Sequence, residues 1–509
     1  RSTQAKTLFP YTTLFRSPVY FDCLGYGWPD SQVAVMMQIS DLNFDYGSED
    51  STIFRRVNLE FSAGEFSIIA GPTGSGKSTL LKVMNKLAPT FSGGRFSGSL
   101  RIDEIEFENA RPKDLARRIG YVNQTPESSF VAETVIEELA FGMEQLGIDR
   151  AEMQQNIAKY SQLFGLQELL QSSLNNLSAG EQQRVAITAA LVAGQKVLLL
   201  DEPTSALDSD AAQKLVVALR ELSTKNGTTV IITEHRLENL VDLADSVVLL
   251  KGDGSAQKKD ASWENIYSTF PSWRSTEPKA ANQLKPEQAI GQVLKSAELT
   301  VQYPGAQNLS LNKASIEIKP KEIVALVGPN GSGKTTLLDA LAGQVKFSGS
   351  ISFGENNLAN KKQQEINKVI ALVPQCASDL LFLSTVSQEL SESDAYAAVT
   401  QNTTSGIFSK LVGRINPAIH PRDLSVGQQL ALVISLQLAL GAPILALDEP
   451  TRGLDYEAKA ELANLLIRVR DSGKSVLLAT HDLEFANQIA NRLVHLNFGK
   501  ISEDGETAS

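Results

Sequence analysis

One eight-residue pattern that suits phosphate binding occurs twice in the chain. The copies are residues 71–78 and 328–335, and both read G-x-x-x-x-G-K-[S/T]. Glycines at these places allow backbone turns in which successive N–H groups point at one anion, and the lysine adds a cation for the outer phosphates. The hydroxyl of Ser78 or Thr335 is a ligand that Mg²⁺ accepts. The pattern therefore predicts two sites for a polyphosphate with Mg²⁺.

Two apolar runs end in the same acidic sequence. Residues 197–203 read VLLLDEP, and residues 444–450 read ILALDEP. The runs place Asp201 and Asp448 at the edge of a sheet, where a carboxylate can hold Mg²⁺ through water. Glu202 and Glu449 follow by one residue, so they point differently and can polarise a water molecule. The alternative, a solvated turn, fits poorly after four apolar residues and before a proline.

Expected strands and helices place these residues. Short β-rich apolar runs precede the glycine-rich patterns at residues 66–70 and 323–327, and apolar residues at helical spacing follow both patterns. A helix N-terminus behind each loop adds partial positive charge for a phosphate. A chance glycine-rich turn is the alternative, and two copies in this context argue against it.

Further markers recur in the same order in both halves. The sequence LSxG[E/Q]Q occurs at residues 177–182 and 424–429, and each half closes on a histidine after a β-rich run. The other paired markers are an aromatic residue before each loop and a later glutamine: Tyr46 and Tyr303, Gln124 and Gln375. Repetition on this scale indicates a duplicated domain and not a solenoid.

With these markers, residues 38–501 resemble a tandem pair of ATP-binding-cassette (ABC) ATPase domains, a family that the LSxG[E/Q]Q element separates from other P-loop proteins. The resemblance implies an α/β fold of two P-loop NTPase domains. Each domain has a mostly parallel sheet core, an antiparallel β subdomain and a helical subdomain. It also implies ATP and Mg²⁺ as cofactors and an ATP hydrolase activity.

The resemblance implies a role for each marker. Gln124 and Gln375 would contact Mg²⁺ and the attacking water, His235 and His481 would hydrogen-bond the γ-phosphate, and the two tyrosines would stack on adenine. The catalytic candidates are therefore Glu202, Glu449, His235, His481, Gln124 and Gln375. The metal candidates are Ser78, Gln124, Asp201, Thr335, Gln375 and Asp448. The nucleotide-binding candidates are Tyr46, Gly71, Pro72, Thr73, Gly74, Ser75, Gly76, Lys77, Ser78, Thr79, Ser178, Gly180, Tyr303, Gly328, Pro329, Asn330, Gly331, Ser332, Gly333, Lys334, Thr335, Thr336, Ser425 and Gly427. For the tyrosines, a place in the core is the alternative.

Ser178 and Ser425 also carry a structural signal, because a serine followed three residues later by Glu181 or Gln428 is a capping box. A capped helix N-terminus is itself an anion site. In the family it faces the γ-phosphate held by the opposite domain. The resemblance therefore implies two composite sites, in which the loop with Lys77 meets Ser425 and the loop with Lys334 meets Ser178.

The predicted domains are an ABC ATPase at 38–251, a linker at 252–292, a second ABC ATPase at 293–503 and a disordered tail at 504–509. The linker prediction follows from polar composition, although its aromatic residues suggest packing. Residues 7–17 resemble the translation of a sequencing-adapter oligonucleotide. We therefore interpret residues 1–37 as artefactual or disordered, with a natural start near Met36 or Met37; a divergent targeting segment is the alternative.

Bulk properties limit the partners. A net charge of −11 argues against a nucleic-acid binder held by bulk charge, and two cysteines form no disulfide or metal framework. No stretch reads as a membrane span, so any membrane crossing would belong to another chain.

The region after Gln124 bears on the machine that the ATPase drives. Residues 129–142, SFVAETVIEELAFG, are similar to the pattern in energy-coupling-factor (ECF) importers, and the second half retains TVSQEL at 385–390. This resemblance implies an importer of a vitamin, a vitamin precursor or a metal ion at the cytoplasmic face of the cell membrane. Its partners would be a transmembrane scaffold and a membrane substrate-binding subunit. Another ABC importer or exporter, or a soluble tandem-cassette translation ATPase, are the alternatives.

Overall fold

The computed structural model describes residues 34–503, apart from residues 48–51, 104, 108–109, 206, 239, 274–290, 305–307, 360 and 414. Most of the predicted artefactual segment and the whole predicted tail lie outside the described residues. The described residues from Val35 onward form one compact unit, and within it the two halves of the chain fold alike.

Each half contains a six-stranded sheet of the same topology. In the first, the order β10-β9-β3-β8-β7-β6 has five parallel strands and one antiparallel edge strand. In the second, the order β17-β18-β19-β14-β20-β21 is the same arrangement, written from the opposite edge of the sheet. The first set is β3 (Phe66–Ala70), β6 (Ile119–Val122), β7 (Val197–Asp201), β8 (Thr229–Thr233), β9 (Ser246–Leu250) and β10 (Ala256–Asp260). The second set is β14 (Ile323–Val327), β17 (Ile370–Val373), β18 (Ile444–Asp448), β19 (Ser475–Thr480), β20 (Arg492–Asn497) and β21 (Lys500–Glu503).

Each half also has a smaller antiparallel sheet, with strands that come both before and after the glycine-rich loop in the chain. Its strands pair in the orders β2-β1-β4-β5 and β12-β11-β15-β16, with β13 also on β11. These strands are β1 (Val35–Asp45), β2 (Thr52–Ser62), β4 (Arg95–Ile102), β5 (Ile105–Glu106), β11 (Leu294–Val301), β12 (Leu311–Ala314), β13 (Glu317–Ile318), β15 (Ser348–Phe353) and β16 (Asn356–Asn357). The first domain therefore begins earlier than the predicted boundary at residue 38.

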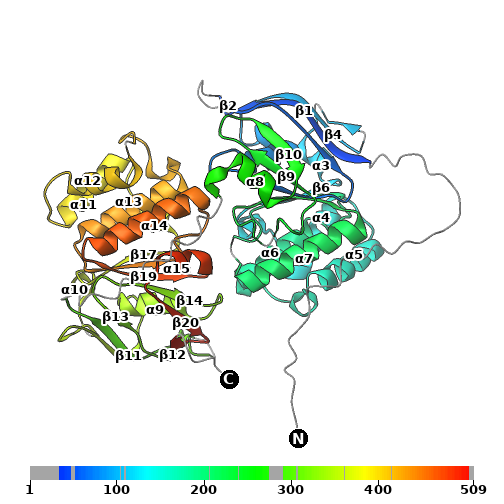
Figure 1. Cartoon of the computed structure of the whole chain (residues 1–509). Helices are drawn as coiled ribbons and strands as arrows, with labels where there is room; N and C mark the ends of the chain where they lie inside the picture. The colour runs from blue at the N-terminus through cyan, green and yellow to red at the C-terminus, as the bar shows by residue number, and fades with distance from the viewer. Residues whose placement is uncertain are drawn as a thin grey trace, which may run out of the picture. The chain divides into compact units, whose positions relative to one another are not determined.

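The helices cover both faces of the parallel sheets. In Figure 1, α4 to α7 lie together on one side of the first sheet, and α11 to α14 lie together on one side of the second. The first-half helices are α1 (Lys77–Met84), α2 (Leu87–Thr90), α3 (Pro112–Leu115), α4 (Val135–Gln145), α5 (Arg150–Leu163), α6 (Ala179–Ala189), α7 (Ser209–Asn226) and α8 (Trp263–Thr269). The second-half helices are α9 (Lys334–Leu341), α10 (Gln363–Ile366), α11 (Val386–Tyr396), α12 (Thr403–Val412), α13 (Val426–Ala439), α14 (Tyr456–Asp471) and α15 (Leu483–Ile489). Short 3₁₀ turns complete them: η1 (Pro126–Ser129), η2 (Gln167–Leu169), η3 (Leu174–Asn176), η4 (Pro271–Trp273), η5 (Ala377–Leu380) and η6 (Pro421–Asp423).

Burial explains why the central strands read as continuous apolar runs. In β7, Leu198 and Leu200 pack in one core cluster, while Val197 and Leu199 pack in the cluster on the opposite face of the sheet. Both faces are covered by helices or by the small sheet, so alternation with polar residues is lost. The apolar strand therefore carries Asp201 to the edge of the sheet without a polar residue before it.

The predicted linker contains ordered structure. Residues 256–260 form edge strand β10, antiparallel to β9, and α8 and η4 follow it. The expected packing of the aromatic residues is confirmed, because Phe270 and Trp273 belong to the core cluster of the first domain. The Trp273 ring also lies 5.4 Å, centroid to centroid, from the ring of Tyr456 on α14. The chain between residues 274 and 290 lies outside the described residues.

Candidate functional site

Both glycine-rich loops join a central strand to a helix. The loop after β3 leads into α1, and the loop after β14 leads into α9, as the sequence predicts. Gly76 and Gly333 cap these helices with φ of 94° and 104°, a left-handed conformation that favours glycine. A Cβ at Gly76 would also meet the side chain of Ile53 at 2.5 Å. Glycine is thus required at this place for two separate reasons.

The loop lysines fold back over their own loops. The Lys77 Nζ donates to the carbonyl oxygens of Gly71 at 2.9 Å and Pro72 at 3.2 Å. The Lys334 Nζ donates to Gly328 at 2.8 Å and Pro329 at 3.1 Å. Burial lowers the pKa of Lys77, although neighbouring carboxylates oppose this shift. The ammonium groups therefore lie where a phosphate on the loop would meet them.

The strand-end aspartates pair with the loop hydroxyls. The Ser78 Oγ donates to Asp201 Oδ1 at 2.9 Å, and the Thr335 Oγ1 donates to Asp448 Oδ2 at 2.8 Å. Burial raises the pKa of Asp448 to about 6 and also raises that of Asp201. Among the described residues, Asp448 Oδ1 is buried and has no hydrogen-bond partner.

This pairing is a donor set that suits Mg²⁺. A hydroxyl and a carboxylate, with an orphaned oxygen beside them, leave room for the waters and phosphate oxygens that complete Mg²⁺ coordination. In the part of the chain that the structure describes, no three His, Cys, Asp or Glu side chains converge as a protein cage for a metal. The residues present fit an ion shared with a bound nucleotide.

The two glutamates sit in equivalent places with different neighbours. Glu202 and Glu449 adopt φ of 47° and 46°, a left-handed conformation that is unusual for glutamate. Glu202 accepts from Gln124 Nε2 at 2.9 Å, and its other oxygen lies 3.0 Å from His235 Nε2. Glu449 Oε2 lies 2.7 Å from His481 Nδ1.

The electrostatics keep both glutamates ionised. Burial raises the pKa of each, but the hydrogen bond from the adjacent histidine and the charge of the loop lysine leave the pKa values of Glu202 and Glu449 below the ordinary value. An ionised carboxylate is an acceptor that can polarise water.

The two glutamines differ in their contact with the neighbouring glutamate, and their predicted contacts with Mg²⁺ and the attacking water stay predictions. Gln124 reaches Glu202, as stated above, whereas Gln375 makes no hydrogen bond to Glu449 within the described residues. The two halves therefore differ at a position where their sequences match.

The tyrosines before the loops are exposed, which excludes the alternative that they belong to the core. Tyr46 is 41% exposed and Tyr303 is 40% exposed. Their hydroxyls lie 3.3 and 3.5 Å from Thr79 Oγ1 and Thr336 Oγ1. A partly exposed ring beside the loop can stack on a flat ligand.

The capping boxes form as predicted. Ser178 caps α6 and pairs with Glu181, and Ser425 caps α13 and pairs with Gln428. The Ser178 contacts lower the pKa of Glu181. Each helix therefore presents a capped N-terminus with its partial positive charge.

Two contacts bring each loop to the opposite half. The Thr73 N–H donates to Asp455 Oδ2 at 2.5 Å, and the Asn330 N–H lies 3.4 Å from Asp208 Oδ2. A cavity of about 490 Å³ is lined by Thr73 together with Ser425 and Gly427. A cavity of about 500 Å³ is lined by Ser178, Gly180 and Asp208. The cavity at Ser425 therefore includes a residue of the opposite loop, whereas the cavity at Ser178 is lined by the first half alone.

Two residues beside the histidines were missed from the sequence. Glu234 and Arg236 flank His235, whereas Thr480 and Asp482 flank His481. Glu234 is buried and accepts from the Thr204 N–H at 2.7 Å and the Thr204 hydroxyl at 2.6 Å. The available signal was the departure of the first half from the repeat at these two positions.

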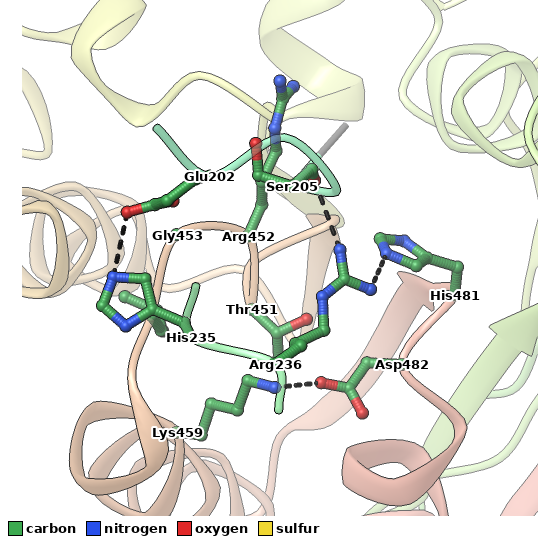
Figure 2. Close-up of a pocket in the computed structure, with 11 residues that line it drawn as sticks. Glu202, Ser205, His235, Arg236, Thr451, Arg452, Gly453, Lys459, His481 and Asp482 are labelled. Carbon is green, nitrogen blue, oxygen red and sulfur yellow. Dashed lines mark hydrogen bonds and ion pairs between the residues drawn. The ribbon is translucent and has the colours of Figure 1, made fainter. Parts of the chain in front are cut away.

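A further space lies between the halves around these residues. Figure 2 shows Arg236 beside Ser205 and His481, with the Lys459 and Asp482 ion pair below. The lining residues leave a volume of only about 10 Å³. This is about the space that a single water molecule needs.

No helix among the described residues is both long enough and apolar enough to span a membrane.

Comparisons with known proteins show the family of the chain. The family described as ABC transporter matches residues 54–205 and 311–452. An ABC transporter ATP-binding protein of Streptomyces coelicolor is 36% identical over 532 residues, covering 93% of this chain and 94% of the relative. One from Bacillus thuringiensis subsp. konkukian is 32% identical, covering 91% and 90%. A solved structure titled RNase-L Inhibitor has a TM-score of 0.59 at 22% identity, covering 91% of this chain and 90% of that chain, a likeness of fold alone.

Proposed function

This chain belongs to the ABC transporter family of ATP-hydrolysing proteins and contains two cassettes, and we propose that it powers the import of a small substrate through separate membrane subunits. The substrate class is a vitamin, a vitamin precursor or a metal ion, and the system is of the energy-coupling-factor type. The chain would act at the cytoplasmic face of the membrane.

At each site different residues would bind the phosphates, the adenine and Mg²⁺. The loop N–H groups with Lys77 or Lys334 bind the phosphates, and Tyr46 or Tyr303 stacks on the adenine. Ser78 with Asp201, or Thr335 with Asp448, would hold Mg²⁺, which when bound neutralises charge on the outer phosphates. Gln124 and Gln375 would lie beside that ion and the attacking water.

Hydrolysis needs a base and a group that meets the γ-phosphate. Glu202 and Glu449 orient and polarise the attacking water, and their lowered pKa values support this role because the carboxylate is the form that accepts a proton. His235 and His481 meet the γ-phosphate. The capped helices beginning after Ser178 and Ser425 complete the opposite site.

The observation that carries the transport proposal is an exposed apolar residue at matching positions of both cassettes. Val131 is 62% exposed and Phe382 is 80% exposed. Glu138 accepts from the N–H groups of Val131 at 2.9 Å and Ala132 at 3.0 Å. Glu389 accepts from the N–H groups of Phe382 at 2.6 Å and Leu383 at 2.7 Å. An apolar side chain held outward on a fixed loop supports contact with a partner.

These loops follow the predicted glutamines and precede α4 and α11. We expect these loops to pass the nucleotide state to a helix of a membrane scaffold that docks in a groove. The names of the relatives, ABC transporter ATP-binding proteins, agree with such a role.

The experiment is purification of the native complex from membranes with and without these side chains. We expect the chain to co-purify with a transmembrane scaffold and a small substrate-binding membrane protein. The pair Val131→Asp and Phe382→Asp should release the chain from the membrane fraction, yet leave ATP binding intact. Phe91→Asp is the matched control, because Phe91 is 76% exposed but lies on neither loop.

Co-purification with ribosomes in place of membrane subunits would overturn the transport proposal. Retention of the double variant on membranes at the wild-type level would show that the two loops are not the docking surface.

A further inference from the structure

His235 and His481, the histidines expected to contact the γ-phosphate, make different hydrogen bonds. His235 faces its own glutamate through Nε2, and its buried Nδ1 has no hydrogen-bond partner within the described residues. His481 faces its glutamate through Nδ1, and its Nε2 lies 2.7 Å from Arg236 Nη1 of the other cassette. Figure 2 shows the Arg236 guanidinium directed at the ring of His481.

The chemistry of that contact fixes the proton on His481. A guanidinium only donates hydrogen bonds, so Nε2 of His481 must be the accepting nitrogen and carries no hydrogen. The hydrogen of the neutral ring is then on Nδ1, where it donates to Glu449. Both ring nitrogens are engaged, and His481 has no N–H to offer to a γ-phosphate.

Arg236 is also bound to its own cassette. Its Nη2 lies 3.4 Å from the Thr204 carbonyl oxygen and 3.3 Å from that of Ser205. Glu234, on the other side of His235, holds the N–H and hydroxyl of the same Thr204. Both residues that flank His235 therefore form hydrogen bonds with the turn after β7.

The chain that follows this turn contacts the loop of the second site. Asp208, which caps α7, lies 3.4 Å from the Asn330 N–H in the second glycine-rich loop. A movement of His235 toward a phosphate at the first site would carry Arg236, its neighbour in the chain, away from His481. The space of about 10 Å³ that Arg236 lines with both histidines holds about one water molecule.

The reverse contact is not available. The residue that corresponds to Arg236 is Asp482, which forms an ion pair with Lys459 at 2.6 Å and caps α15. A carboxylate engaged in this way cannot donate to His235. The coupling therefore runs from the first site to the second.

We propose that Arg236 is a positioning residue that holds His481 in the tautomer whose Nε2 carries no hydrogen until ATP occupies the first site. The proposal rests on the proposed ATP sites and adds an order to them. Nucleotide at the first site releases His481 and so prepares the second site.

The test measures each site separately with MANT-AMPPNP, a fluorescent, non-hydrolysable ATP analogue, in the full chain with Mg²⁺. Lys77→Ala leaves only the second site, and Lys334→Ala leaves only the first. We expect Arg236→Ala to tighten binding to the second site by about 5- to 10-fold, the lower range of allosteric coupling, and to leave the first site unchanged. Arg452→Ala is the matched control, because Arg452 is an arginine of the opposite cassette lining the same space.

A second readout reports the proton itself. The chain has four histidines, so ¹⁵N spectra of the histidine rings can be assigned by single substitutions to glutamine. Without nucleotide, His481 should show an unprotonated Nε2 and a protonated Nδ1. Arg236→Ala should give a mixture of the two tautomers, while Arg236→Lys, which keeps a donor, should retain the wild-type signal. Arg452→Ala should not change it.

Equal effects of Arg236→Ala on both sites, or no effect on the second, would overturn the proposal, as would an unchanged His481 spectrum. Failure of the site assignment gives a different result, because the analogue would then bind the Lys77→Ala, Lys334→Ala double variant as tightly as the wild type.

Discussion

Asp448 offers a direct test of the electrostatics of the second site. It is 4% exposed, its Oδ1 has no hydrogen-bond partner among the described residues, and burial raises its pKa to about 6. Glu449 and Asp339 raise that pKa further by repulsion. In the absence of Mg²⁺, an ionised Asp448 should therefore destabilise the second cassette. We expect Asp448→Asn to stabilise the nucleotide-free chain and to abolish Mg²⁺-dependent turnover at that site.

The magnitude follows from the pKa. A rise from 3.8 to about 6 is about 2 units, or about 3 kcal/mol at neutral pH as an upper value. The new amide N–H₂ group and the coupling to Glu449 reduce this to roughly 1–3 kcal/mol. For a cassette of about 200 residues, the corresponding shift in Tm is about 2–10 °C.

The sign of the pH dependence is fixed by the direction of the pKa shift. The folded state binds the Asp448 proton more tightly than the unfolded state, so stability falls as pH rises from about 4 to about 6. The full penalty is present above that window. The gain from Asp448→Asn should therefore be largest near pH 7.5 and fall to about half near pH 5.

The assay is calorimetric melting of the full chain in EDTA without nucleotide. Asp201→Asn is the matched control in the first cassette. Asp201 Oδ1 accepts from the hydroxyls of both Ser78 and Thr233, at 2.9 and 2.7 Å, so its charge is better compensated and the gain should be smaller. A Tm gain for Asp448→Asn that is absent at pH 7.5, or the same at pH 5, would refute the reasoning.

Two further predictions concern the catalytic bases and the domain boundary. Glu202→Gln together with Glu449→Gln should lower ATP hydrolysis at least about 100-fold and trap ATP between closed cassettes, because a base that accepts the proton is lost; a wild-type rate by phosphate release would contradict the assignment. Cleavage at a protease site inserted between Trp273 and residue 291 should leave two folded cassettes, each with its own melting transition. Loss of both transitions on cleavage would show that the boundary is misplaced.

The sequence predicts the parts of the site that depend on local spacing. The loops around Lys77 and Lys334, the aspartates at the ends of β7 and β18, and the caps at Ser178 and Ser425 all follow from short patterns with a local physical cause. The fold class follows as well, because each half repeats the same order of such patterns.

Contacts between residues far apart in the chain cannot be predicted from local spacing. The pairing of Arg236 with His481 joins residues far apart in the chain, and no spacing rule brings them together. The sequence of strand β10, AQKKD, has no apolar alternation and therefore predicts a linker. As an antiparallel edge strand it leaves its side chains partly exposed, so the usual signal of a strand is weak.

The two proposed docking loops carry side chains of unequal size, which should restrict the orientation in which the chain can dock. Val131 and Phe382 occupy matching places but differ in volume, and one polypeptide always presents one of each. A scaffold with two identical sockets would fit one side chain and leave the other badly packed. If the proposed function holds, the membrane partner should therefore be pseudo-symmetric, with a narrow recess and a wide one, and only one of the two orientations related by half a turn should dock.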